Sequence, residues 1–306
     1  MRGEKSMIEV CDVTKKFDSF KALDNLSLNV EKGSIYGLVG PNGAGKTTLM
    51  KIIMGVYKAD NGKILVSDEN VYENIKIKDN MIYISDDLYF FNNFSIKQMR
   101  DLYKKVYSNW SDERFNKLAE VFNIDIKRNV NKLSKGMKKQ VAFWLAMSAK
   151  PEILILDEPL DGLDPVMRRK VLNIMMQDVA DRELTVMISS HNLRELEDIC
   201  DHVGILNNGK LVLQRKLDDM KSETHKIQVA FKNGEFPQEF ENKFKILHKT
   251  QLGQVYSIIL NGNKETITKE LQKYNPMILD VIPLTLEEIF IYELGGEGYE
   301  IKEIIL

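Results

Sequence analysis

The pattern of apolar and polar positions over residues 1–220 predicts short strands that alternate with helices. One apolar run, residues 34–39, leads directly into a glycine-rich loop that is followed by an apolar helix. Another, residues 153–156 (Ile-Leu-Ile-Leu), is continuously apolar, which is typical of a parallel strand covered on both faces. Strands that alternate with helices indicate a parallel sheet in an α/β domain. The predicted strands of this region are residues 7–10, 26–30, 34–39, 153–156, 184–189 and 203–206.

Residues 88–140 interrupt this alternation and predict a helical insertion. Ser95 and Ser111 each precede a stretch whose apolar residues recur at spacings of three and four. A serine in this place accepts a hydrogen bond from a backbone N–H of the first helical turn, so both serines are predicted helix caps. A further helix is predicted over residues 137–149.

A polar, charged segment at residues 216–224 predicts a domain boundary. We therefore expect one domain over residues 1–220 and a second over residues 221–306. Strand and helix patterns continue beyond the boundary and predict a small α+β domain. Its predicted strands are residues 227–231, 245–248, 255–260 and 278–282, and its predicted helices are residues 264–274 and 286–294.

The bulk composition narrows the classes of function. The 306 residues include 43 basic and 45 acidic side chains, a formal net charge of −2, whereas nucleic-acid binders usually show a basic excess. No apolar run approaches the roughly 18 residues that span a bilayer, so we expect a soluble chain that reaches a membrane only through a partner. Cys11 and Cys200 lack metal-ligand spacing, and we expect two reduced, buried thiols.

The glycine-rich loop matches the P-loop pattern Gly-x-x-x-x-Gly-Lys-Thr in full. Triphosphate oxygens must approach backbone N–H groups closely, so the tight points of the loop require glycine. The helix that follows adds free N–H groups and the positive end of its dipole. Lys46 is predicted to reach the β- and γ-phosphates, and the Thr47 hydroxyl to bind Mg²⁺. The predicted nucleotide-binding residues of the loop are Gly40, Asn42, Gly43, Gly45, Lys46, Thr47 and Thr48.

Two adjacent acids, Asp157 and Glu158, end the apolar run at residues 153–156. Buried carboxylates at the end of a strand destabilise a protein unless a cation or hydrogen-bond donors compensate their charge. The simpler alternative is that the two acids are solvated. Phosphoryl transfer needs one group that holds the metal and another that orients the attacking water. We therefore predict that Asp157 holds Mg²⁺ and that Glu158 polarises the water.

Four further features occur in the order that the ATP-binding subunits of ABC transporters show, and residues 7–220 resemble that family. Residues 133–137 (Leu-Ser-Lys-Gly-Met) lie where the family has its signature motif, and residues 160–164 (Leu-Asp-Gly-Leu-Asp) resemble its D-loop. His191 resembles the switch histidine, and Phe17 lies where an aromatic ring usually stacks on adenine. The resemblance implies a P-loop NTPase fold of the ABC type, with a RecA-like parallel sheet, an antiparallel β subdomain and a helical subdomain.

The resemblance also implies a mechanism. It predicts an ATPase that binds ATP and Mg²⁺, with Glu158, His191 and Lys46 as catalytic residues. Ser134 and Gly136, at the start of a predicted helix, would form an anion site facing the γ-phosphate that a second subunit binds. ATP would then lie in the interface of a head-to-tail homodimer or heterodimer. The further partner would be an integral-membrane transporter subunit, with this chain at the cytoplasmic face of the membrane, and no nucleic acid is expected.

Asp86 occupies the place of the glutamine in the family's Q-loop. It is either a third ligand of Mg²⁺, beside Thr47 and Asp157, or a surface acid. Asp87 takes its place if the motif is shifted by one residue.

The signature motif and the adenine position also leave choices open. Lys135 and Met137 replace the usual Gly and Gln of the signature, whereas Ser134 and Gly136 keep the anion site. Loss of the glutamine would weaken contacts with the ribose, and Lys135 either adds attraction to the phosphate or points away. Phe20 competes with Phe17 as the ring that stacks on adenine.

Two other patterns have a structural and a functional interpretation. The aromatic run at residues 88–94 either borders a groove for the membrane subunit or packs inside the helical insertion. The lysines at positions 135, 138 and 139 are predicted to form a solvated helix face rather than a nucleic-acid site.

The signature variant and the C-terminal extension resemble an exporter branch of Gram-positive bacteria that includes bacitracin-resistance and acetoin-associated ATPases. Transport-coupled ATP hydrolysis, in a transporter that exports its substrate, is therefore the predicted function. The alternatives are a soluble ABC ATPase that acts on ribosomes or DNA, and a regulatory module in which hydrolysis is secondary.

Overall fold

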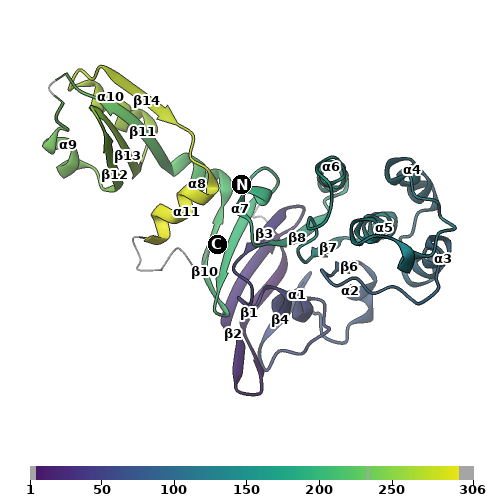
Figure 1. Ribbon diagram of the computed structural model, residues 1–306. Helices are drawn as coiled ribbons and strands as arrows, with labels where there is room; N and C mark the ends of the chain where they lie inside the picture. Colours follow the sequence, from purple (N-terminus) through teal and green to yellow (C-terminus); the bar gives the residue numbers. More distant parts are fainter. Residues whose placement is uncertain (1–4, 233, 296–306) are drawn as a thin grey trace. The chain divides into compact units, whose positions relative to one another are not determined.

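The computed structural model describes residues 5–232 and 234–295, and its contacts divide the chain into two compact units (Figure 1). The first unit comprises Met1–His191 and Ile199–Gln214, and the second comprises Asn192–Asp198 and Arg215–Leu306. The short segment Asn192–Asp198 therefore groups with the C-terminal part of the chain, which the sequence pattern did not predict.

A six-stranded sheet with the order β10-β9-β3-β8-β7-β6 forms the centre of the first unit. β3 pairs in parallel with β8 and β9, and β7 pairs in parallel with β6 and β8. Every residue of β3 and β7 is buried, as expected of strands covered on both faces. The strands are β3 (Ile35–Val39), β6 (Met81–Ile84), β7 (Ile153–Leu156), β8 (Thr185–Ser190), β9 (His202–Asn207) and β10 (Lys210–Lys216).

A second, antiparallel sheet has the order β2-β1-β4-β5. Its inward side chains, such as Ile8 and Val10, share one apolar cluster with Leu49 and Ile53 of α1. The alternation along β1 turns Cys11 away from that cluster, so the prediction of a buried thiol is wrong for Cys11, whereas Cys200 is buried. The elements are β1 (Ser6–Phe17), β2 (Phe20–Glu31), β4 (Asn61–Val66), β5 (Glu69–Asn70) and α1 (Lys46–Ile53).

The predicted helical insertion is confirmed, and α3 and α4 pack against α5 (Figure 1). Ser95 forms a capping box with Gln98 at the start of α3, and Ser111 caps α4. Trp144 of α5 is fully buried, stacks on Phe115 with ring centroids 4.5 Å apart, and donates to Phe115 O at 2.8 Å. The helices of this unit besides α1 are α2 (Ile75–Asp79), α3 (Ile96–Val106), α4 (Asp112–Phe122), η1 (Val130–Lys132), α5 (Lys135–Ser148) and α6 (Pro165–Arg182).

The second unit contains an antiparallel sheet with the order β12-β13-β11-β14, which with its two crossing helices has the ferredoxin-like pattern βαββαβ. Phe240 of α9 and Ile267 of α10 are buried against the sheet. α9 was not predicted because its six residues bury only Phe240, too few for a helical period to show. The elements are α7 (Leu193–Leu196), α8 (Leu217–Glu223), β11 (Thr224–Ala230), α9 (Gln238–Lys243), β12 (Ile246–Leu252), β13 (Val255–Asn261), α10 (Lys264–Gln272), β14 (Ile278–Ile282) and α11 (Leu286–Gly295).

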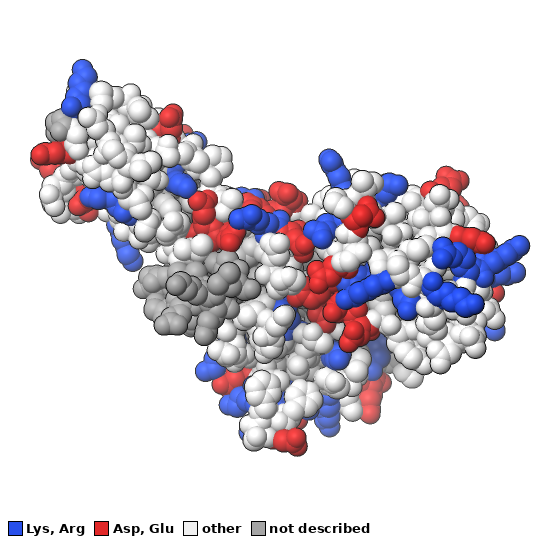
Figure 2. All heavy atoms as spheres, viewed as in Figure 1, with Lys and Arg blue, Asp and Glu red and all other residues white. Residues whose placement is uncertain are grey.

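Charged side chains of both signs are interspersed over the face shown in Figure 2. Among the described residues, many charged side chains form ion pairs, including Lys104 with Asp112 at the surface and Arg114 with the buried Asp178. This mixture accords with the small net charge of the sequence.

Candidate nucleotide-binding and catalytic site

The glycine-rich loop joins β3 to α1, and its geometry requires glycine. Gly45 has a φ of 109° and Gly43 a φ of 83°, left-handed values that side chains disfavour. A Cβ atom on Gly40 would lie 2.2 Å from Leu206 O, so a side chain does not fit there. The backbone is therefore bare at the positions where phosphate oxygens must approach it.

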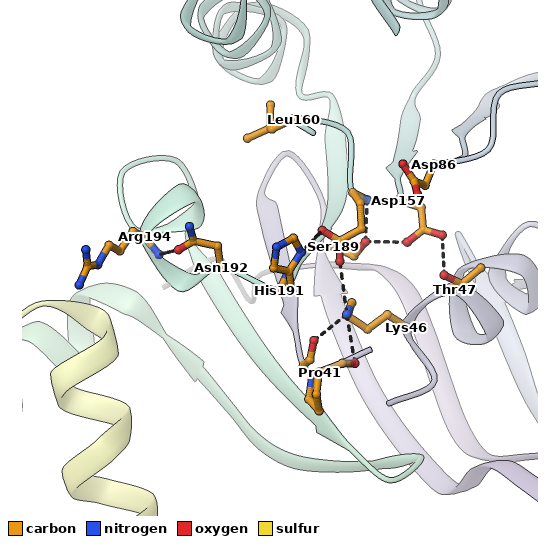
Figure 3. Close-up of polar contacts among 12 residues, drawn as sticks. Pro41, Lys46, Thr47, Asp86, Asp157, Leu160, Ser189, His191, Asn192 and Arg194 are labelled. Carbon is orange, nitrogen blue, oxygen red and sulfur yellow. Dashed lines mark hydrogen bonds and ion pairs between the residues drawn. The ribbon is translucent and has the colours of Figure 1, made fainter. Parts of the chain in front are cut away.

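Lys46, the first residue of α1, is only 6% exposed, and its ammonium lies over the loop (Figure 3). Nζ donates to Gly40 O at 2.6 Å and to Pro41 O at 3.3 Å. It also lies 3.3 Å from Glu158 Oε1. The positive charge therefore lies between the loop and the acid that follows β7.

Asp157, at the end of β7, is a buried carboxylate with three hydrogen-bond donors. Thr47 Oγ1 donates to Oδ2 at 2.7 Å, Tyr83 OH donates to Oδ2 at 3.1 Å, and Ser189 Oγ donates to Oδ1 at 2.7 Å. Burial, followed in size by the negative charge of Asp157, raises the pKa of Tyr83, so its hydroxyl stays protonated and donates. The hydroxyl and carboxylate oxygens of Thr47 and Asp157 are the hard donors that Mg²⁺ prefers.

Glu158 adopts a left-handed backbone conformation, with a φ of 44°. Its N–H donates to Ser189 Oγ at 3.0 Å, and its Oε2 lies 2.9 Å from His191 Nδ1. Oε1 faces Lys46 and accepts no hydrogen bond from the described residues. Glu158 and His191 follow neighbouring parallel strands, so the fold brings together acids and a histidine that are far apart in sequence (Figure 3).

Asp86 lies two residues after β6, and two lysines of α5 bind its carboxylate. Lys135 Nζ is 3.4 Å and Lys139 Nζ is 3.2 Å from Oδ1. Burial raises the pKa of Asp86, but the hydrogen bond and charge of Lys139 and the charge of Lys135 outweigh it and hold the pKa below its usual range. Asp86, and not Asp87, lines the cavity over the P-loop.

The prediction that the α5 lysines form a solvated face is wrong for Lys139. Its side chain is fully buried. Residues 141–148, which follow on α5, are buried all round the helix, so α5 enters the core of the unit at this position and Lys139 is on its inward side. Asp86 supplies the opposite charge that a buried ammonium requires.

A cavity of 330 Å³ lies over the P-loop. Phe17 and Phe20 both line it, with exposed fractions of 40% and 61%, so the structure brings both candidate adenine rings to the loop. Its lining residues are Phe17, Phe20, Ala22, Pro41, Asn42, Gly43, Ala44, Gly45, Lys46, Thr47, Thr48, Asp86, Asp157 and Glu158.

Ser134 and Gly136 do not line this cavity, although they belong to the same unit. Ser134 is exposed, and its hydroxyl caps α5 by accepting from Met137 N at 3.2 Å. A Cβ atom on Gly136 would lie 2.4 Å from Gly162 O, so glycine is required there for close contact with the D-loop backbone. Ser134 and Gly136 of one chain therefore lie outside the cavity over its own P-loop, although the neighbouring Lys135 reaches Asp86 at the cavity wall.

Three residues that carry contacts in this site were not predicted. Tyr83 and Ser189 hold Asp157, and Lys139 holds Asp86. The signal for Ser189 was present, because a hydroxyl at the end of a buried strand needs a polar partner. Tyr83 and Lys139 have no such local signal.

These features define a P-loop ATP-binding domain with an inserted helical part. A family model described as "ABC transporter" matches residues 23–161. The chain is 34% identical to the ABC transporter ATP-binding protein YtrB of Bacillus subtilis (strain 168), over 95% of this chain and 99% of that protein. It is 31% identical to the bacitracin transport ATP-binding protein BcrA of Bacillus licheniformis, over 95% of this chain and 98% of that protein. A solved ATP-binding subunit of an ABC transporter matches with a TM-score of 0.66 and 26% identity, over 71% of this chain and 92% of that chain.

The chain belongs to the ATP-binding subunits of ABC transporters. It is an ATPase that converts ATP and water to ADP and phosphate, and it powers a bacterial ABC transporter. The predicted family, fold class and enzyme class are therefore confirmed. Within residues 5–232 and 234–295, no helix is both long enough and apolar enough to cross a membrane.

Proposed function

We propose that this chain hydrolyses ATP at the cavity over its P-loop, and that Glu158 is the residue that activates the attacking water. The observation that carries this proposal is the placement of the Glu158 carboxylate between Lys46 and His191. Oε1 is a buried acceptor beside a cation, which suits a group that orients water and takes its proton.

The other residues bind and position the triphosphate. The bare backbone at Gly40, Gly43 and Gly45 cradles the phosphates, and Lys46 binds the β- and γ-phosphates. His191 donates a hydrogen bond to the γ-phosphate. The loop residues Asn42 and Thr48 complete the phosphate site, and either Phe17 or Phe20 stacks on adenine.

Thr47 and Asp157 hold Mg²⁺ in this proposal. Their side chains already share a hydrogen bond of 2.7 Å, and both are hard oxygen donors. Mg²⁺ held by these two residues would supply positive charge that stabilises the triphosphate during hydrolysis. Asp86 has two lysine partners within its own chain, so we assign it a positioning role rather than direct binding of the metal.

We propose that a second copy of this chain completes the site with Ser134 and Gly136. The N-terminus of α5 presents an exposed hydroxyl and the positive end of a helix of 14 residues, which suits a γ-phosphate. Because Ser134 and Gly136 lie outside the P-loop cavity of their own chain, a head-to-tail dimer is the arrangement that would bring them to a bound triphosphate.

We further propose that the chain serves an exporter, at the cytoplasmic face of the membrane, through an integral-membrane subunit. The bacitracin transport relative supports this direction of transport. Within the aromatic run, Phe90 is buried, whereas Tyr89 and Phe91 are 79% and 47% exposed. Tyr89 and Phe91 are therefore the candidate contacts for the membrane subunit.

The Glu158→Gln variant tests the catalytic assignment. Its carboxamide keeps the shape of the side chain but cannot take the proton, so we expect ATP turnover to be lost and an ATP-bound dimer to accumulate. Phosphate release and light scattering after size exclusion measure the two effects. Normal turnover in this variant would show that another group is the base.

Purification from membranes with and without Phe91→Ala tests the partner. We expect a membrane protein with several transmembrane spans to co-purify with the natural chain and to be depleted with the variant. Lys117→Ala, a change at an exposed ion pair with Glu113, is the matched surface control. Failure to recover such a protein with the natural chain would contradict the proposed partner.

A further inference from the structure

Lys139 is a fully buried lysine in the second turn of α5, beyond the cavity that holds the nucleotide. A buried ammonium destabilises a protein unless its charge is matched and its protons are donated. Lys139 Nζ meets both conditions, because it lies 3.2 Å from Asp86 Oδ1 and donates to Glu158 O at 2.6 Å. One side chain therefore joins α5 to the segments that follow β6 and β7.

The contact with Glu158 concerns an unusual stretch of backbone. A non-glycine residue in the left-handed region costs roughly 1–2 kcal/mol, and Pro159 follows, which favours an extended conformation at Glu158. Such a conformation persists only when its surroundings hold it. Here the Glu158 N–H is bound by Ser189 Oγ, and the Glu158 carbonyl is bound by Lys139 Nζ.

Lys135 provides an internal comparison, because it also binds Asp86. Its side chain is 63% exposed, and its Nζ lies 3.4 Å from Asp86 Oδ1. The charge of Asp86 is therefore matched from two sides, whereas the Glu158 carbonyl accepts its side-chain hydrogen bond from Lys139. The two lysines differ because Lys139 binds the backbone carbonyl of Glu158, whereas Lys135 binds Asp86.

We propose that Lys139 is a positioning residue for ATP hydrolysis, which holds the left-handed backbone of Glu158 so that its carboxylate stays between Lys46 and His191. The Asp86–Lys139 pair then couples the Q-loop position to Glu158 through one buried side chain. This inference rests on the proposed role of Glu158 and extends it to a residue outside the cavity.

The first test is Lys139→Met, which keeps an unbranched apolar stem and removes the ammonium. Because a hydrogen bond from a charged donor is lost at the catalytic backbone, we expect kcat to fall about 10-fold or more. The affinity for ATP, measured with a fluorescent analogue, should stay within about threefold, since Lys139 does not line the nucleotide cavity. Lys138→Met makes the same chemical change one residue earlier on α5 and should keep the natural kcat.

A second test separates positioning from general damage to the fold. In the Glu158→Gln background, which is expected to bind ATP without turning it over, Lys139→Met should leave the ATP-bound dimer intact, because the residue that it positions has already been disabled. Loss of that dimer would mean that Lys139 acts on the whole unit, and it would overturn the proposal.

The third variant, Asp86→Asn, is informative even if Lys139→Met fails to fold. Asp86→Asn removes the charge partner of Lys139 but leaves the hydrogen bond from Lys139 to Glu158 O. We therefore expect kcat to fall less than it does in Lys139→Met. If Lys139→Met does not fold, the expected loss of kcat in Asp86→Asn is below about 10-fold. Asp86→Asn that abolishes turnover would make Asp86 itself essential and overturn the assignment.

The outcomes for the two proposals are distinguishable. Natural kcat in Lys139→Met, together with loss of turnover in Glu158→Gln, refutes the positioning role alone. Turnover that survives in Glu158→Gln refutes Glu158 as the catalytic base, whatever Lys139→Met shows.

Discussion

Ser189→Ala removes one buried hydroxyl that serves both acids of the site. Ser189 Oγ donates to Asp157 Oδ1 at 2.7 Å and accepts from Glu158 N at 3.0 Å, and the residue is fully buried. The substitution therefore takes a donor from a carboxylate and leaves a backbone N–H without its acceptor. An unsatisfied buried group costs about 1–3 kcal/mol, so we expect a loss of about 2–4 kcal/mol in stability.

A loss of that size is measurable in the melting of the first unit. For a unit of roughly 200 residues, each kcal/mol shifts the midpoint by about 2–4 °C, so calorimetry should show a decrease of roughly 4–16 °C. ATP turnover should fall about tenfold, because both acids lose part of their orientation. Thermal scans and phosphate release provide the two assays.

Ser148→Ala is the matched control for this prediction. Ser148 is also fully buried, but its hydroxyl donates to Trp144 O one turn earlier on the same helix. Loss of that bond should change stability by less than about 1 kcal/mol and leave turnover intact. If Ser189→Ala behaves like Ser148→Ala in both assays, the hydroxyl does not hold the two acids and the reasoning fails.

Other consequences of the structure can be measured on single variants. Trp144→Ala should destabilise the first unit by about 3–5 kcal/mol, because a fully buried indole leaves a cavity beside Phe115; calorimetry checks this, and a shift below about 1 kcal/mol would contradict it. Gly136→Ala should displace the D-loop, since the new Cβ would lie 2.4 Å from Gly162 O, and phosphate release should slow; unchanged turnover would show that the contact yields without consequence. Burial, together with the charge of Lys264, lowers the pKa of His225 in the folded protein, although backbone hydrogen bonds oppose this shift. The neutral imidazole therefore contributes folding stability above the unfolded pKa of about 6.5, and this contribution is lost as pH falls from there through the folded pKa. Melting of the second unit from pH 8 to pH 5 should therefore show an acid loss that His225→Gln reduces, and equal pH dependence in both proteins would exclude His225 as the cause.

Motifs made of neighbouring residues could be predicted from the sequence, because their chemistry is local. The P-loop glycines are required by the backbone of one turn, and the serine caps of α3 and α4 act within one helical turn. Asp157 and Glu158 follow a continuously apolar run, so their place at the end of a buried strand was predictable.

Contacts between distant segments could not be predicted in the same way. Lys139 was interpreted as part of a solvated face because the pattern of α5 shows lysines and not the acid that one of them meets. Asp86 is 53 residues away from Lys139 in the sequence, and only the packing of α5 against β6 brings them together. The grouping of α7 with the C-terminal unit, through the ion pair of Arg194 with Glu287, depends likewise on tertiary contacts.

Disulfide cross-linking between two copies tests the central arrangement most directly. One copy carries Asn42→Cys in the P-loop and the other carries Ser134→Cys at the start of α5, both in the Glu158→Gln background, and the two are mixed in equal amounts with ATP and Mg²⁺. A covalent dimer that contains one copy of each, formed with ATP and absent without it, is the predicted result. If ATP binds but no such mixed dimer forms, the nucleotide is not shared between the P-loop of one chain and the signature helix of another.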